Sequence, residues 1–206
     1  FTESVLGTKK KQMSNKHKRE KFFKVVKHNL IKEEVGEFSK ETSPASYLKI
    51  EEDKLIVFAK KFIQAQGRFV YCESEKDFVQ KLQSHIAYRK WEKILAFNEN
   101  LNSYLNSVGV ETVLENDNAI VGISLCQAMI ANSGSILITS NQGFGGKVNK
   151  LPSIFIVIAH SSQIYSNYKE ALQPLLEAIP QNISTFMPSE ALKQSVIEFY
   201  LYVIEQ

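Results

Sequence analysis

The sequence predicts an α/β fold: a Rossmann-like, mixed and mostly parallel sheet with helices on both faces, preceded by a basic N-terminal helix. Three observations support this prediction. Short apolar runs alternate with helix-length amphipathic segments between residues 50 and 114, as they do in βαβ units. A second series of short apolar runs follows closely from residue 119. The chain has 206 residues, 44% of them hydrophobic, which suffices for one domain of this class.

The basic character belongs to the N-terminal part of the chain, which we expect to be a helical arm and linker over residues 1–49. Residues 1–30 carry nine Lys or Arg and two acids, whereas the remainder carries sixteen Lys or Arg and twenty acids. Apolar spacing predicts a helix over residues 9–29 with a narrow apolar stripe. Such a helix could bind nucleic acid or an acidic membrane surface. No aromatic residues interleave with its Lys-rich half, so we expect a solvated helix docked on the domain and no nucleic-acid partner.

The α/β domain is expected over residues 50–206, and its first half alternates helices with strands. A helical face contains Leu55, Phe58 and Phe62, and Ser74 suits the start of a helix over residues 75–90. A third helix is expected over residues 99–108. The apolar runs around these helices predict strands at 68–72, 93–97 and 113–114. Ligands of such sheets bind beyond the carboxyl ends of the strands.

After residue 119 the apolar runs lie too close together for helical crossovers. Strands near 119–123, 127–131 and 135–140 therefore predict a hairpin-like, mixed region. A buried strand over 154–159 follows. We then expect a long helix over 162–179 and two last strands, over 183–187 and 199–204.

Several classes of protein are disfavoured. No run approaches the ~18–20 apolar residues that span a bilayer, and the first residues lack the order of a secretory signal. The two cysteines, Cys72 and Cys126, lie in apolar runs and form no C-x-x-C motif. The chain alone therefore cannot hold an iron–sulfur cluster or structural zinc. We expect buried thiols, no cofactor in this chain and a cytoplasmic location.

Two small-residue segments are candidate anion sites. The turn Asn132-Ser133-Gly134-Ser135 follows an apolar strand; it is either a tight connection whose hydroxyls satisfy backbone groups or a cradle for a ligand. The segment from Gly143 to Lys147 contains Gly145 and Gly146, and is either an anion-binding nest or a simple turn. It is not a P-loop, because Asn141 stands where the first glycine would be.

His160 follows a buried strand, where catalytic groups of α/β folds often lie, although a histidine at a strand–helix junction is the alternative. The nucleophile motif G-x-S-x-G is absent, because the segment Asn132-Ser133-Gly134-Ser135 does not fit its first position. We assign no nucleophile and no general base, so whether the chain is an enzyme stays open.

The region from Ile120 to Leu172 resembles the signature of LUD-domain proteins, the LutC-type lactate-utilization proteins of bacteria. The shared blocks are an apolar V-G-I, a strand into [ST]-G-[ST], an apolar triplet, a glycine-containing loop, and L-P before a strand of type I-x-I-V-I-A. They are Val121-Gly122-Ile123, Ser133-Gly134-Ser135, Ile136-Leu137-Ile138, Leu151-Pro152 and Ile154–Ala159.

This resemblance implies a fold like that of the NagB/RpiA/CoA-transferase superfamily. It also implies a role in lactate or organic-acid utilization beside LutA-type and iron–sulfur LutB-type partner proteins, with a small anionic metabolite bound. The candidate ligand-binding residues are Asn132, Ser133, Gly134, Ser135, Gly143, Gly145, Gly146, Lys147, Lys150, His160, Pro188 and Ser189.

The sequence departs from the family pattern where charged groups are usual. Asn132 replaces Glu or Arg, Gly146 replaces Arg, and Phe155 replaces His. The late motif G-P-S-R-T-A-D-I is reduced, although Pro188 and Ser189 remain. Fewer cationic donors weaken the binding of anions. The alternatives are therefore a non-catalytic interaction or regulatory protein with a degenerate site and, third, a sugar-phosphate or CoA-ester enzyme.

Overall fold

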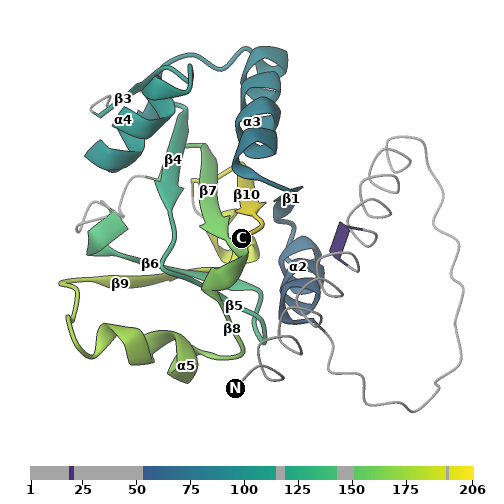
Figure 1. Cartoon of the computed structure of the whole chain (residues 1–206), viewed down its shortest axis with the longest axis vertical. Helices are drawn as coiled ribbons and strands as arrows, with labels where there is room; N and C mark the ends of the chain where they lie inside the picture. The colour runs from purple at the N-terminus through teal and green to yellow at the C-terminus, as the bar shows by residue number, and fades with distance from the viewer. Residues whose placement is uncertain (1–18, 21–52, 115–118, 143–150, 194) are drawn as a thin grey trace, which may run out of the picture. The chain divides into compact units, whose positions relative to one another are not determined.

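The computed structural model describes residues 19–20, 53–114, 119–142, 151–193 and 195–206 (Figure 1). The chain divides into two compact units, Phe1–Ile56 and Val57–Gln206. In the first unit Arg19 and Glu20 are helical, and Arg19 Nε lies 2.9 Å from Asp53 Oδ2. The rest of the basic helix and the boundary expected after residue 49 lie outside the described residues, so both stay predictions.

The main sheet of the second unit has six strands, and every neighbouring pair is parallel. Its central strands are nearly continuous apolar runs, as is typical of strands covered on both faces. Every residue from Ile154 to Ala159 is buried, for example. Across the sheet the order is β1 (Arg68–Cys72), β10 (Glu198–Ile204), β7 (Ile154–His160), β4 (Val121–Leu125), β2 (Ile94–Ala96) and β3 (Thr112–Val113).

A second, smaller sheet contains the hairpin that the closely spaced runs predicted. Its order is β8 (Ile164–Tyr165), β5 (Ala128–Ile130), β6 (Ser135–Thr139) and β9 (Ile183–Phe186). β6 is antiparallel to both β5 and β9, whereas β8 is parallel to β5. The mixed pairing is thus confined to this sheet. It begins where β4 and β7 end, because those strands lead directly into β5 and β8 (Figure 1).

Helices lie on both faces of the main sheet, as the sequence predicted. Helices α3 (Glu75–Arg89) and α4 (Glu99–Ser107) bury their apolar side chains in one cluster with the strands. On the other face, Phe62 of α2 (Lys54–Gln64) meets the Phe199 ring edge-on at 5.6 Å. The second sheet covers the same face, since Phe155 of β7 lies 5.9 Å from Phe186 of β9 between ring centroids.

The long helix predicted over residues 162–179 is wrong. Residues Ser161–Gln163 form a 3-10 helix (η2), the strand β8 follows, and only then come α5 (Tyr168–Leu172) and the 3-10 helix η3 (Gln173–Leu175). Asn167 starts α5 by accepting the N–H of Glu170 at 3.0 Å, and Pro174 has no N–H with which to continue the α-helical ladder.

Two short elements complete the fold. The 3-10 helix η1 covers Ser140–Gln142, and α6 covers Pro188–Ala191. Within the described ranges, no helix is both long and apolar enough to cross a membrane.

Candidate functional site

The strand order places a topological switch point between β2 and β4. β2 continues into α4 on one face of the main sheet, whereas β4 continues into the second sheet on the other. The strand ends are tied together, because Phe97 N donates to Ile123 O at 3.1 Å. Asn98 Oδ1 caps α4 by accepting the N–H of Asn100 at 2.9 Å. Open α/β sheets bind their ligands in the crevice outside such a point.

A pair of glutamines marks the β4 side of the switch point. Gln127 lies two residues beyond β4, and its Oε1 accepts from Gln142 Nε2 at 3.1 Å. Gln142 Oε1 in turn accepts the backbone N–H of Thr139 at 2.8 Å and its hydroxyl at 2.7 Å. Gln142 is therefore fixed beside the carboxyl end of β4. The five loop candidates lie outside the described residues: Gly143, Gly145, Gly146, Lys147 and Lys150.

His160 ends β7, as predicted. Its backbone N–H donates to Gln163 Oε1 at 2.7 Å, and Gln163 Nε2 donates to the carbonyl of Cys126 at 2.9 Å. The Gln163 side chain therefore links the carboxyl ends of β7 and β4. The ring atom His160 Nδ1 is buried, and among the described residues no group hydrogen-bonds to it. His160 Nδ1 could therefore hydrogen-bond to a ligand near the carboxyl end of β7.

The hydroxyl groups of the Ser-Gly-Ser turn bond to other protein groups. Ser135 is fully buried, and its Oγ lies 2.5 Å from Ser133 Oγ and 2.5 Å from the hydroxyl of Tyr168. Ser133 Oγ also accepts the N–H of Ser135 at 3.3 Å. These bonds favour the interpretation of the turn as a tight strand connection, because the hydroxyls that would contact a ligand have partners inside the protein.

Close packing explains the glycine of that turn. Gly134 has a φ of +71°, a conformation that favours glycine, and a Cβ at this position would lie 2.7 Å from Lys61 Cβ and 2.9 Å from Phe62 N. The Lys61 ammonium donates to the carbonyl of Asn132. The turn is thus pressed against α2, and Gly134 is required by this contact.

The described candidates fall into two places. Pro188 and Ser189 begin α6, two residues after β9, whose Phe186 is opposite Ile136 at the turn end of β6. They lie on the side of the turn over residues 132–135, whereas His160 lies at the other end of the hairpin, near Cys126. Sequence reasoning treated these residues as one set.

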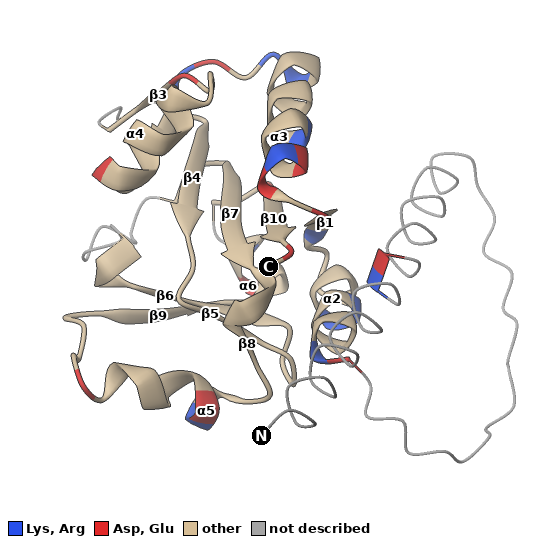
Figure 2. Ribbon diagram, in the orientation of Figure 1, with Lys and Arg blue, Asp and Glu red and all other residues tan. Residues whose placement is uncertain are grey.

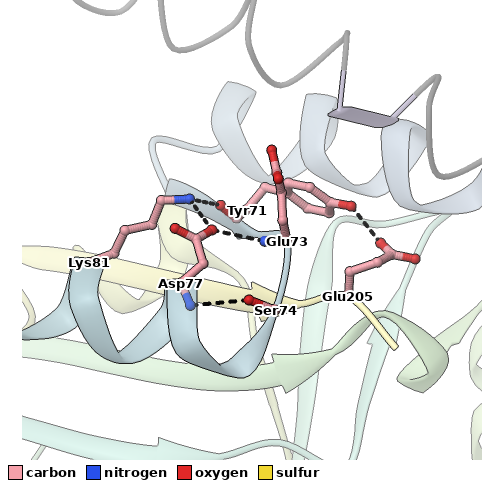
Figure 3. A network of polar contacts seen from close by, with 6 residues as sticks. All are labelled: Tyr71, Glu73, Ser74, Asp77, Lys81 and Glu205. Atoms are coloured by element: carbon pink, nitrogen blue, oxygen red, sulfur yellow. Dashed lines mark hydrogen bonds and ion pairs between the residues drawn. The ribbon is translucent and has the colours of Figure 1, made fainter.

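The carboxyl ends of β1 and β10 carry a separate polar network (Figure 3). Lys81 Nζ donates to the carbonyl of Tyr71 at 2.8 Å and to Asp77 Oδ2 at 2.5 Å. The Tyr71 hydroxyl donates to Glu205 Oε2 at 2.8 Å. Because this lysine is engaged by a carboxylate and a carbonyl, the network stabilises this end of the sheet.

Both cysteines are buried free thiols, as expected. Burial raises the pKa of Cys72 and of Cys126 to about 12 in each case. Neither is therefore a thiolate at neutral pH, the form that acts as a nucleophile or metal ligand. In the described part of the chain no three His, Cys, Asp or Glu side chains gather as metal ligands would.

An open pocket of about 520 Å³ lies at the opposite edge of the sheet, at the amino ends of β1 and β10. Its arginine is already paired, since Arg68 Nε lies 3.8 Å from Glu198 Oε2 and the guanidinium lies 5.3 Å from the centre of the Tyr200 ring. This leaves little free positive charge for an anion. The pocket is lined by Gln66, Arg68, Leu192, Ser195, Val196, Ile197 and Glu198.

Part of the chain matches the model of a known protein family. Residues 97–192 match the family model of the LUD domain. Over this range the chain is similar to a LUD domain. The matched range begins directly after β2 and contains the whole second sheet and every candidate ligand-binding residue. The resemblance seen in the sequence is therefore confirmed.

A solved structure shares the fold of this LUD-domain chain. It is a DUF162 family protein from Deinococcus radiodurans, with a TM-score of 0.62 and 12% sequence identity; the likeness covers 78% of this chain and 99% of that one. At this identity the likeness concerns the fold alone. No curated protein matches the sequence.

Sequence reasoning missed two residues that shape this LUD domain. Tyr168, which bonds to Ser135, was assigned only to a helix face, and nothing in the sequence linked it to a turn 33 residues away. Gln163 follows His160 by three residues, and this spacing at the end of a strand is the signal that could have indicated a side-chain bond back to the His160 N–H.

Proposed function

We propose that this LUD-domain chain binds a small organic anion at the carboxyl ends of β2, β4 and β7 and acts in lactate or related organic-acid utilization. The LUD domain family is associated with lactate utilization in general. The observation that carries the proposal is the hydrogen bond between Gln127 and Gln142 at the switch point. The glycine-rich segment, the best candidate for an anion nest, begins in the sequence directly after Gln142.

The chemistry of the edge suits a carboxylate with a polar substituent. Asn98, Gln127 and Gln142 are neutral amides, and His160 Nδ1 can donate or accept according to its tautomer. In the proposal Lys147 or Lys150 supplies the positive charge, and backbone N–H groups of the loop complete the cradle. A lysine ammonium acts as a point charge, whereas an arginine guanidinium can bind both carboxylate oxygens at once. We therefore expect the anion to bind weakly.

The proposal extends to partners. A chain whose two cysteines are both buried has no thiolates with which to hold a redox cluster. We therefore propose that oxidation of the organic acid takes place with separate proteins, of LutA type and iron–sulfur LutB type.

Calorimetric titration with L-lactate and pyruvate tests the binding site. We expect Lys147→Ala to weaken binding at least tenfold without changing the melting temperature, since one charge-assisted bond is worth about 1.5–3 kcal/mol. Lys169→Ala, on the exposed face of α5, is the matched control and should bind as the unchanged chain does. Equal affinity in the Lys147 and Lys169 variants would remove the proposed site.

A second candidate function is a non-catalytic interaction or regulatory protein. It is favoured by the Ser133-Gly134-Ser135 turn, whose hydroxyls bond to each other and to Tyr168. If this candidate is right, lactate, pyruvate, sugar phosphates and CoA esters should not raise the melting temperature of the chain. Stabilisation by the last two classes alone would instead favour a sugar-phosphate or CoA-ester enzyme.

A further inference from the structure

The strand β9 is an edge of the second sheet, and half of its backbone groups point away from its partner. Ser140 N donates to Asn182 O at 3.0 Å, in line with the register that pairs Thr139 with Ile183. In an antiparallel pair, hydrogen-bonded and non-bonded residue pairs alternate. Ser184 therefore bonds to β6, whereas the N–H and C=O groups of Ile183 and Thr185 face outward.

An apolar surface adjoins this edge. The exposed fractions are 43% for Ile183, 77% for Ile179 and 65% for Leu176. Thr185 is opposite Leu137, which packs with Leu175 in a buried cluster. Ile183 and Thr185 therefore share the face of the sheet that carries η3, from which Leu176 and Ile179 follow directly in the chain.

The edge lacks the features that usually prevent strands from pairing between molecules. No charged residue occurs from Ala178 to Ser189, and Figure 2 shows β9 free of Lys, Arg, Asp and Glu along its length. Soluble proteins usually place lysine, proline or a bulge on such a strand, or keep it very short. The other edges conform: β3 and β8 have two residues each, and β1 begins with Arg68 and is followed by Glu73.

We propose that β9 joins two copies of this chain, pairing antiparallel with β9 of the second copy about a two-fold axis at Ser184. Each Ile183 then exchanges both backbone hydrogen bonds with Thr185 of the second copy, which makes four bonds across the axis. The two second sheets form one continuous sheet, and the Ile183, Ile179 and Leu176 surfaces extend along it. The pairing is isologous, so one edge supplies both halves of the interface.

The absence of charge favours a second copy over other partners. Two identical uncharged strands meet without like-charge repulsion and without burying an unpaired charge. A nucleic acid or a charged peptide would find no complementary charge between Ala178 and Ser189. Strand addition at a free edge takes its affinity from main-chain bonds, which the copy supplies in register.

Light scattering after size-exclusion chromatography gives the first test. We expect the 206-residue chain to elute at twice its mass of 23.4 kDa at high concentration and Thr185→Pro to elute as a monomer. Proline removes an outward N–H and no bond to β6. Ile183→Lys should also be monomeric, whereas Ile197→Lys, at a 72% exposed isoleucine directly before the interior strand β10, should remain a dimer.

A cross-link tests the register. At the axis Ser184 meets its own copy in a non-bonded pair, where Cα atoms lie about 4.5 Å apart, within the range for a disulfide. Mild oxidation should therefore cross-link two copies of the Ser184→Cys variant. The native thiols of Cys72 and Cys126 are both buried and should not cross-link. Ile183→Cys should not cross-link, because Ile183 pairs with Thr185 of the second copy and lies two residues out of register with the Ile183 of that copy.

Three results would overturn the proposal. They are a monomer at every concentration, a dimer that persists in both Thr185→Pro and Ile183→Lys, and equal cross-linking of the two cysteine variants. Circular dichroism of each variant tests whether the fold is retained. The Ser184→Cys test does not depend on a substitution that disrupts β9.

Discussion

The hydroxyl of Ser135 lies 2.5 Å from the hydroxyl of Tyr168, so a residue of α5 holds the turn between β5 and β6. This contact separates the role of the turn from that of the anion site. The small residues that mark the family motif connect two strands and pack against α2, whereas the ligand position that we propose is at the carboxyl ends of β2, β4 and β7.

Removing the Tyr168 hydroxyl should weaken the fold without affecting ligands. We expect Tyr168→Phe to lower the free energy of unfolding by about 1 kcal/mol, because one hydrogen bond to a fully buried hydroxyl is lost. Urea denaturation measures the change. Tyr88→Phe, at a side chain that is 84% exposed, is the control and should be neutral. A loss of pyruvate binding in Tyr168→Phe would indicate that the ligand binds at the turn over residues 132–135 and not at the strand ends.

Gly134→Ala should be more destabilising than Gly109→Ala. Both glycines have a positive φ, +71° and +77°, so both variants carry strain of about 1–2 kcal/mol. At Gly134 the new methyl group also meets Lys61 and the backbone of Phe62, which we expect to add about 1–3 kcal/mol. At Gly109 the nearest atom is Gln83 Nε2 at 3.3 Å, at the end of a flexible side chain. Similar melting temperatures for the two variants would show that the contact with α2 is unimportant.

Gln163 should be important for the stability of the strand ends. We expect Gln163→Ala to cost about 2 kcal/mol, because the His160 N–H and the Cys126 carbonyl both lose a partner. Gln173→Ala, an exposed glutamine of η3, should change stability by less than about 0.5 kcal/mol. Chemical denaturation compares the two variants, and a Gln163 variant as stable as the control would argue against the bridge.

Stability should fall as the pH falls below neutrality because of His85. Burial, and after it the charge of Arg89, lowers the pKa of this imidazole below its ordinary value of 6.5. Its Nδ1 lies 2.6 Å from the Tyr202 hydroxyl, and the ring packs against both Trp91 and Tyr200.

Proton binding by the unfolded chain determines the direction of this pH dependence. Below pH 6.5 the unfolded chain protonates His85 while the folded chain resists, so the unfolded state binds more protons and the free energy of unfolding decreases. We expect this decrease to begin below pH 6.5, and we expect a flatter profile for His85→Gln. The lowered pKa of Glu198 acts in the same direction at lower pH, below its ordinary value of 4.5. If the free energy of unfolding of the unchanged chain and of His85→Gln depended on pH in the same way, groups other than His85 would cause the decrease.

Local signals in the sequence identified most of the fold. β1, β7 and β10 are apolar runs bounded by polar residues, and such runs form strands wherever both faces are covered. The helix predicted over 162–179 failed because Ile164 and Tyr165 pair with Met129 and Ile130. That pairing joins segments 35 residues apart, and the apolar spacing of a strand followed by a helix imitates one long helix.

The candidate site was predictable only in part, for the same reason. His160 could be placed at a strand end because the strand before it is continuous and apolar. The bonds of Gln163 to Cys126 and of Tyr168 to Ser135 depend on how the second sheet folds back on the first. The separation of Ser133–Ser135 from His160 likewise follows from hairpin geometry, which residue type alone does not specify.

We propose that an organic anion binds at the switch point of the main sheet. Titration of the ¹⁵N-labelled chain with pyruvate, followed by the backbone amide signals, tests it most directly. We expect shifts at Phe97, Asn98, Gln127 and His160, with the signals of residues 132–135 unchanged. Shifts confined to residues 132–135 or to the pocket beside Arg68, or no shifts at all, would contradict it.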